Sequence, residues 1–203
     1  MSAAKIELVA FDLGNVLCTV DEKTPAQKLA ALSGRTWQQV HEIAFDRQHK
    51  LLFESGKISF ADHARRAIAE LGITMGVSEF TDFYDAALIP SAEMFPLVSH
   101  IAENRRIAMV SNTSEPHWEY ASRFLPFSGL LDPVIVSYSV GSMKPQPEFY
   151  ESLLKRSGVE AARVLFVDDL AVNIDAARAA GMEGHRFRSK AALENTLAGY
   201  GIL

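Results

Sequence analysis

Four short groups of polar residues contain the side chains that chemistry on a phosphate ester requires. In chain order they are D-L-G-N-V at 12–16, S-N-T at 111–113, G-S-M-K-P at 141–145 and V-D-D-L-A-V-N-I at 167–174. Phosphoryl transfer needs a nucleophile held in line and neutralisation of the charge on the phosphate oxygens. Carboxylates, hydroxyls and a lysine are groups that meet these needs.

Three of the groups follow segments that have the pattern of a buried strand. The apolar run Ile6–Phe11 ends at Asp12, and the run 106–110 ends in Ser111-Asn112-Thr113. The run 163–167 ends in Asp168-Asp169. Short, nearly continuous apolar runs of this kind are typical of parallel strands covered on both faces. In such sheets the ligand lies beyond the carboxyl ends of the strands, so these groups are expected to meet at one edge.

The rest of the C-terminal part alternates between helical and strand patterns. Helices are predicted at 92–102, 115–123, 147–156 and 171–180, and further strands at 133–137 and 185–187. This alternation predicts an α/β fold with a doubly wound parallel sheet.

The segment 20–89 breaks this alternation. Only helical periodicity is found there, at 24–32, 37–45, 60–71 and 78–86. We therefore predict a core domain formed by residues 1–19 and 90–203. A small all-helical cap at 20–89 is inserted between the first strand and its crossover helix, where it can act as a lid.

Taken together and in this order, the four groups resemble those of the haloacid dehalogenase superfamily. The resemblance spans about Ile6 to Phe187 and implies a Rossmann-like core with a C1-type cap. D-L-G-N-V and F-E-S-G-K-I-S at 53–59 are similar to a branch of small-cap sugar phosphatases, resembling glucose-1-phosphatase, and to the N-terminal domain of epoxide hydrolases. The implied activity is Mg²⁺-dependent hydrolysis of a small phosphomonoester, with sugar phosphates as one candidate class.

The resemblance also implies roles for individual residues. Asp12 takes the position of the nucleophile that forms a phospho-aspartyl intermediate, and Lys144 that of the lysine pairing with nucleophile and phosphate. Ser111 matches the phosphate-binding hydroxyl, with Asn112 beside it. Asn15 is expected to bind the substrate. Ser111 also has a simpler interpretation, because Ser-Asn-Thr is common in turns and helix caps.

A cation is expected between the nucleophile and the phosphate. A carboxylate and a phosphate repel each other by about 1 kcal/mol per charge pair in water, and by several times that in a cleft. Mg²⁺ prefers oxygen ligands, and the expected ones are Asp12, the Gly14 carbonyl and Asp168, with Asp169 as a further ligand or catalytic neighbour. The alternative is that Asp168 and Asp169 cap the following helix.

The match departs from the family pattern at Gly14. Most phosphatases of the superfamily have a second aspartate there, which protonates the leaving oxygen and later activates water. Losing such a group costs about 10²- to 10⁴-fold in rate. One alternative is therefore a phosphate-binding or regulatory protein with attenuated turnover, and another is a 2-haloacid dehalogenase. Asp21 is a candidate substitute acid, although it also suits a helix start.

The composition limits the partners. The formal net charge of -5 argues against a nucleic-acid surface, and no segment has the length and apolarity of a membrane span. A single cysteine, Cys18, fits a reducing cytoplasm. The expected partner is a small phosphorylated metabolite in the cytoplasm. We derive no oligomeric state from the sequence.

Overall fold

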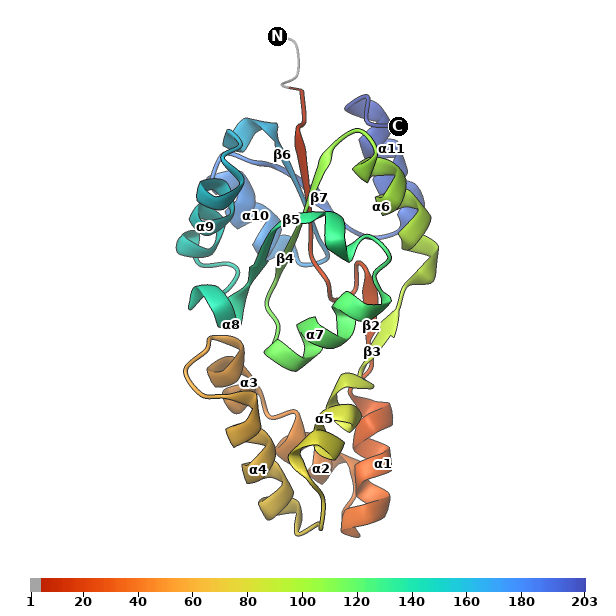
Figure 1. Ribbon diagram of the computed structural model, residues 1–203, viewed down its shortest axis with the longest axis vertical. Helices are drawn as coiled ribbons and strands as arrows, with labels where there is room; N and C mark the ends of the chain where they lie inside the picture. The colour runs from red at the N-terminus through yellow and green to blue at the C-terminus, as the bar shows by residue number, and fades with distance from the viewer. Residues whose placement is uncertain (1–4) are drawn as a thin grey trace.

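The computed structural model describes residues 5–203, which contain a five-stranded sheet with helices on both faces (Figure 1). Its spatial order is β5-β4-β1-β6-β7, and all neighbouring strands run parallel. In that order the strands are Leu131–Val136, Arg106–Ser111, Leu8–Phe11, Val164–Asp168 and Glu183–Arg186. The α/β class predicted from the sequence is confirmed. Residues 1–4 of the predicted core segment lie outside the described residues.

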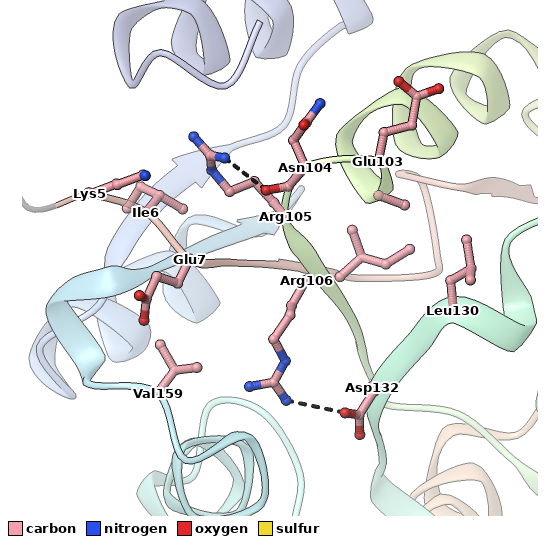
Figure 2. Close-up of a pocket in the computed structure, with 12 residues that line it drawn as sticks. Lys5, Ile6, Glu7, Glu103, Asn104, Arg105, Arg106, Leu130, Asp132 and Val159 are labelled. Carbon is pink, nitrogen blue, oxygen red and sulfur yellow. Dashed lines mark hydrogen bonds and ion pairs between the residues drawn. The ribbon is translucent and has the colours of Figure 1, made fainter.

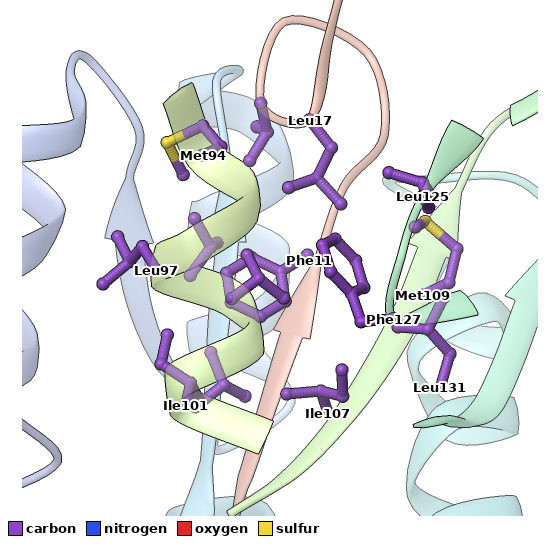
Figure 3. Packing of buried hydrophobic residues seen from close by; sticks show 14 of the residues in the cluster. Phe11, Leu17, Met94, Leu97, Ile101, Ile107, Met109, Leu125, Phe127 and Leu131 are labelled. Atoms are coloured by element: carbon purple, nitrogen blue, oxygen red, sulfur yellow. The ribbon is translucent and has the colours of Figure 1, made fainter. Parts of the chain in front are cut away.

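Two layers of helices cover the sheet because successive side chains of a strand point to opposite faces. Val9 and Phe11 of β1 pack against α6 (Phe95–Ala102), α7 (Glu115–Phe124) and α11 (Lys190–Gly199), as Figure 3 shows for Phe11 and α6. Leu8 and Ala10 face the other way, toward α9 (Pro147–Ser157) and α10 (Ala171–Ala179). Burying each large apolar side chain contributes about 1.5–3 kcal/mol, and these two layers fix the strand ends in place.

The expected core elements form, with small shifts at their ends. The helix expected from Ala92 begins instead as a 3-10 turn at Ala92–Met94, and α6 follows from Phe95. Pro96 lies in the first turn of α6, where its missing N–H costs no helical hydrogen bond. The short helix α8 (Ser137–Val140) was not predicted, and a single turn offers no periodicity from which to predict it.

Five helices lie between the sheet strand β1 and α6, and they share a core of their own. They are α1 (Lys23–Ser33), α2 (Trp37–Ala44), α3 (Arg47–Glu54), α4 (Phe60–Leu71) and α5 (Val77–Asp85). We call this group the cap; its buried residues include Leu29, Phe53, Phe80 and Tyr84. The prediction missed α3, although Asp46 caps it by accepting hydrogen bonds from the amides of Gln48 and His49.

A short antiparallel ribbon joins the cap to the sheet. Its strands are β2 (Cys18–Val20), which precedes α1, and β3 (Leu88–Pro90), which follows α5. In Figure 1 the cap lies below the end of the sheet toward which β1 runs. No helix within residues 5–203 is long and apolar enough to cross a membrane.

The cap touches the core at two further places. Tyr84 of α5 stacks on His117 of α7 with ring centroids 4.3 Å apart, and His117 Nε2 lies 3.1 Å from the Tyr84 carbonyl. The turn after α3 also approaches α8. A Cβ placed on Gly56 would lie 2.6 Å from the Tyr138 carbonyl oxygen, so only glycine permits this approach.

We predict that Gly56→Ala loosens the contact between cap and core. Gly34→Ala is a matched control, because both glycines have a positive φ but a Cβ on Gly34 meets nothing within 4 Å. Both variants should lose about 1–2 kcal/mol from the left-handed backbone. Gly56→Ala should lose a further 1–3 kcal/mol, roughly, from the clash. Denaturant unfolding measures both losses, and equal losses would contradict the packing role of Gly56.

Asp85 makes the free energy of unfolding depend on pH. Burial raises the pKa of Asp85 from 3.8 to about 7, with Asp82 adding to the rise and Arg123 opposing it. The unfolded chain releases this proton near pH 4 and the folded chain only near pH 7, so the free energy of unfolding falls as pH rises between them.

Asp85→Asn should therefore stabilise the protein at pH 8 more than at pH 4, with a difference on the order of 1 kcal/mol or more. Urea unfolding at the two pH values measures this difference. Glu79→Gln, an exposed change on the same helix, is the control. An equal effect of Asp85→Asn at both pH values would contradict a raised pKa of Asp85 in the folded protein.

Candidate active site

The three polar groups predicted at strand ends meet at the carboxyl edge of the sheet. Phe11 of β1 is in register with Met109 of β4 and with Val167 of β6, so the residues that follow each of them are neighbours. The Asp12 amide donates to the Val167 carbonyl at 2.9 Å. Carboxylate oxygens of Asp12, Asp168 and Asp169 all lie within 4.8 Å of one another.

Lys144 lies buried between two of these carboxylates. Its Nζ is 2.8 Å from Asp12 Oδ1 and 2.6 Å from Asp168 Oδ2, and it donates to the Val110 carbonyl at 3.1 Å. Asn112 holds the lysine's backbone through two hydrogen bonds, accepting from the Lys144 amide at 2.8 Å and donating to its carbonyl at 3.0 Å. The S-N-T and G-S-M-K-P groups are thus tied to each other.

Burial sets the ionisation of this pair. It raises the pKa of Asp12 from 3.8 to about 6, with Lys144 opposing the rise and Asp168 adding to it. Burial alone would lower the pKa of Lys144, but the charges of Asp12 and Asp168 outweigh it and hold that pKa above its ordinary value. The ammonium group is therefore charged at neutral pH and can stabilise an anion beside Asp12.

The two adjacent aspartates have different surroundings. Asp168 is fully buried, and its oxygens accept hydrogen bonds from Asn173 Nδ2 at 3.0 Å and from the Leu170 amide at 2.9 Å, besides the contact with Lys144. Asp169 is only partly buried and accepts one hydrogen bond from Asn15 Nδ2 at 3.1 Å. Asp168 is therefore held rigidly, while Asp169 has more oxygen surface free for a ligand.

The donor set fits a divalent cation. With all three carboxylates ionised and Lys144 protonated, the cluster carries three negative charges and one positive, an excess of two negative charges. Mg²⁺ would cancel this excess, and carboxylate oxygens are the ligands that it prefers. Asp12 and Asp169 offer oxygens that Lys144 and Asn173 do not fully occupy. The Gly14 carbonyl lies two residues beyond Asp12 on the same connection.

Ser111 lies buried at the end of β4, next to β1. Its hydroxyl makes one long hydrogen bond of 3.4 Å to the Asn112 carbonyl. The helix that follows, α7, is capped by Ser114, whose side chain accepts from the His117 amide. Ser111 is therefore not the capping residue of this helix, and its hydroxyl remains a candidate phosphate ligand.

Asp21 serves the start of α1. Its oxygens accept hydrogen bonds from the Lys23 and Thr24 amides and from the Thr24 hydroxyl. These hydrogen bonds, that of the Thr24 hydroxyl first, lower the pKa of Asp21, which makes it a poor proton donor. Of its two interpretations, helix-start residue and substitute acid, the geometry favours the first.

A wide hollow of about 880 Å³ lies away from this cluster, at the opposite ends of β1 and β4 (Figure 2). Two of its arginines are engaged locally: Arg106 pairs with Asp132 at 3.2 Å, and Arg105 donates to the Asn104 carbonyl at 2.8 Å. None of the four sequence groups reaches it. The polar groups and this hollow are therefore at different ends of the sheet.

Comparisons with known proteins show the family of the chain. A family model described as haloacid dehalogenase-like hydrolase matches residues 6–181. A sesquiterpene phosphatase from Aspergillus oryzae is 30% identical over 182 residues, which cover 86% of each chain. A D-ribitol-5-phosphate phosphatase from Bacteroides thetaiotaomicron is 25% identical over 193 residues, covering 88% of this chain and 90% of that one.

A solved structure has the same fold. A HAD family enzyme of Bacteroides thetaiotaomicron, in complex with magnesium and inorganic phosphate, superimposes with a TM-score of 0.78. The two sequences are 18% identical, and the match covers 91% of this chain and 96% of that one.

We predict that Asp169→Ala weakens Mg²⁺ binding at least about tenfold, since losing even an outer partner of a metal ligand typically costs 10- to 100-fold in affinity. Asp175→Ala, an exposed aspartate on α10, is the control and should bind as the wild type does. Calorimetric Mg²⁺ titration measures both. Unchanged affinity in Asp169→Ala would remove this residue from the ligand set.

Proposed function

The chain belongs to the haloacid dehalogenase-like hydrolase family, and from this premise we propose that it is a phosphatase acting on a small phosphomonoester through a phospho-aspartyl intermediate. The observation that carries the proposal is the position of Lys144, buried against the nucleophile candidate Asp12 and against Asp168. A cation fixed beside a carboxylate is the arrangement that an in-line attack on phosphate requires.

In the proposed reaction, Asp12 attacks phosphorus and the ester oxygen leaves. Lys144 and the Ser111 hydroxyl bind the phosphate oxygens, with the Asn112 backbone beside them. Water then attacks the phospho-aspartate, which releases inorganic phosphate and restores the carboxylate. Bound Mg²⁺ would neutralise phosphate charge, and we propose Asp12, Gly14, Asp168 and Asp169 as the residues that hold it, with Asp169 more open than Asp168.

The relatives support the choice of a phosphatase. Two of them are phosphatases by name, one acting on a sugar-alcohol phosphate, and one structure of the same fold contains magnesium and phosphate. Dehalogenation needs no metal, and it gives no reason for an acidic pair beside a buried carboxylate. We therefore propose a small phosphorylated metabolite as substrate, with sugar phosphates as one class, in the cytoplasm.

The alternative is a phosphate-binding or regulatory protein with attenuated turnover. It rests on one observation, that Gly14 stands in place of an acid/base aspartate. A binding or regulatory protein would bind Mg²⁺ and phosphate without turnover. Phosphate release measured over a panel of sugar phosphates and nucleotides, with Mg²⁺ and with a chelator, separates the two proposals. Release that depends on the metal supports the phosphatase.

We predict that Asp12→Asn abolishes phosphate release, because the neutral amide cannot form the intermediate, while Lys144 keeps its partner Asp168 and the fold persists. Thermal unfolding checks the fold, and Asp175→Asn is the exposed control. Phosphate release by Asp12→Asn at the wild-type rate would show that Asp12 is not the nucleophile.

A further inference from the structure

Glu54, the last residue of α3, is a buried carboxylate in the cap. Only 6% of it is exposed, and none of the side-chain hydrogen bonds found among residues 5–203 involves its carboxylate. The buried polar atoms without a partner in that range include Tyr84 Oη but no Glu54 oxygen. Its oxygens therefore keep some accessible surface.

The fold brings the end of α3 to the part of the core that carries Lys144. Helix α3 packs against α8, and the turn after Glu54 brings Gly56 against the Tyr138 carbonyl. Lys144 lies six positions after Tyr138 along the chain. Figure 1 shows α3 directly beneath α8, at the end of the cap nearest the sheet. The charges of Asp12 and Lys144 influence the pKa of the Glu54 carboxyl, in opposite directions.

Burial, more than the charges nearby, favours a retained proton on Glu54. Lys50, one turn earlier on α3, forms its ion pair with Glu22, with Nζ 2.6 Å from Oε1, and His41 also contacts Glu22 at 3.0 Å. Among the ion pairs found in residues 5–203, none includes Glu54. Burial raises the pKa of Glu54 from 4.5 to about 7; Lys50 and Lys144 oppose this rise, and Glu22 and Asp12 add to it. Both protonation states are then populated near neutral pH.

We propose that Glu54 is the proton-transfer residue of the reaction, supplied by the cap in place of the aspartate that Gly14 replaces. This inference rests on the proposed phosphatase function. In the first step Asp12 forms a bond to phosphorus, the ester P–O bond breaks, and the leaving oxygen takes the Glu54 proton to become an alcohol. In the second, Glu54 accepts a proton from the attacking water, and the bond between phosphorus and Asp12 breaks. Glu54 ends protonated, as it began.

Leaving groups of different basicity test this role. Glu54→Gln keeps the size of the side chain but cannot transfer the proton. It should lower kcat/KM for β-glycerophosphate by about 10²-fold or more, the usual contribution of a general acid. For p-nitrophenyl phosphate, whose leaving group departs without a proton, the first step should be nearly unaffected. The rate should thus depend more steeply on leaving-group basicity, and phospho-aspartate should accumulate in acid-quenched samples.

Two further variants complete the experiment. Glu42→Gln, the same change at an exposed cap position on α2, should behave as the wild type. Gly14→Asp in the Glu54→Gln background should recover activity on β-glycerophosphate. A Cβ at Gly14 would meet only Val20 Cγ2 at 3.5 Å, an ordinary contact, so this position has room for a side chain.

A wild-type rate in Glu54→Gln, or an equal loss on both substrates without accumulated phospho-aspartate, would overturn the assignment. That failure is distinct from failure of the phosphatase proposal. Trapping phospho-aspartate on Asp12 in the wild type tests the phosphatase proposal alone, and it does not depend on Glu54.

Discussion

Lys144 is buried between Asp12 and Asp168, and this contact links the ends of three neighbouring strands. The lysine comes from the loop after α8, while the two carboxylates follow β1 and end β6, and its third partner is the carbonyl of Val110 in β4. Removing one partner of a buried ion pair is strongly destabilising, by about 3–5 kcal/mol. The sheet therefore needs Lys144 for its own stability as well as for the proposed chemistry.

The ion pairs of Lys144 leave the site with an excess of negative charge, because one lysine cannot balance three carboxylates. This excess suits a divalent cation, which can in turn bind a phosphate. Asn173 and the Leu170 amide hold Asp168 against Lys144, so Asp169 and Asp12 have the more accessible oxygens. In the proposed reaction the cap adds the missing proton donor, Glu54. The contact between cap and core then matters for the chemistry.

Much of the core and the site could be predicted from the sequence because both depend on local patterns. Apolar runs ending in Asp12, Ser111 and Asp168 identify buried strands, and parallel strands bring their carboxyl ends to one edge. The convergence of these residues follows without knowledge of side-chain positions. The four groups, matched in order, indicated the haloacid dehalogenase family, and the comparisons confirm it.

What the sequence did not reveal depends on contacts between distant segments. Asp168 and Asp169 differ in their hydrogen-bond partners: Asn173 donates to Asp168, and Asn15 donates to Asp169. These two asparagines come from different elements. Helix α3 was missed because its eight residues begin with four polar ones, although the cap at Asp46 is a usable signal. Glu54 is buried at the end of α3, which packs on both α4 and α8, and no periodicity in the sequence encodes these contacts.

The most direct test of the central claim, that the strand-end carboxylates and Lys144 form a cation-dependent phosphate site, is a crystal structure of the protein soaked with Mn²⁺ as a substitute for Mg²⁺. We predict an anomalous difference peak bounded by Asp12, Asp168 and Asp169. A peak only elsewhere on the chain, or none at an Mn²⁺ concentration that supports phosphate release, would contradict the account.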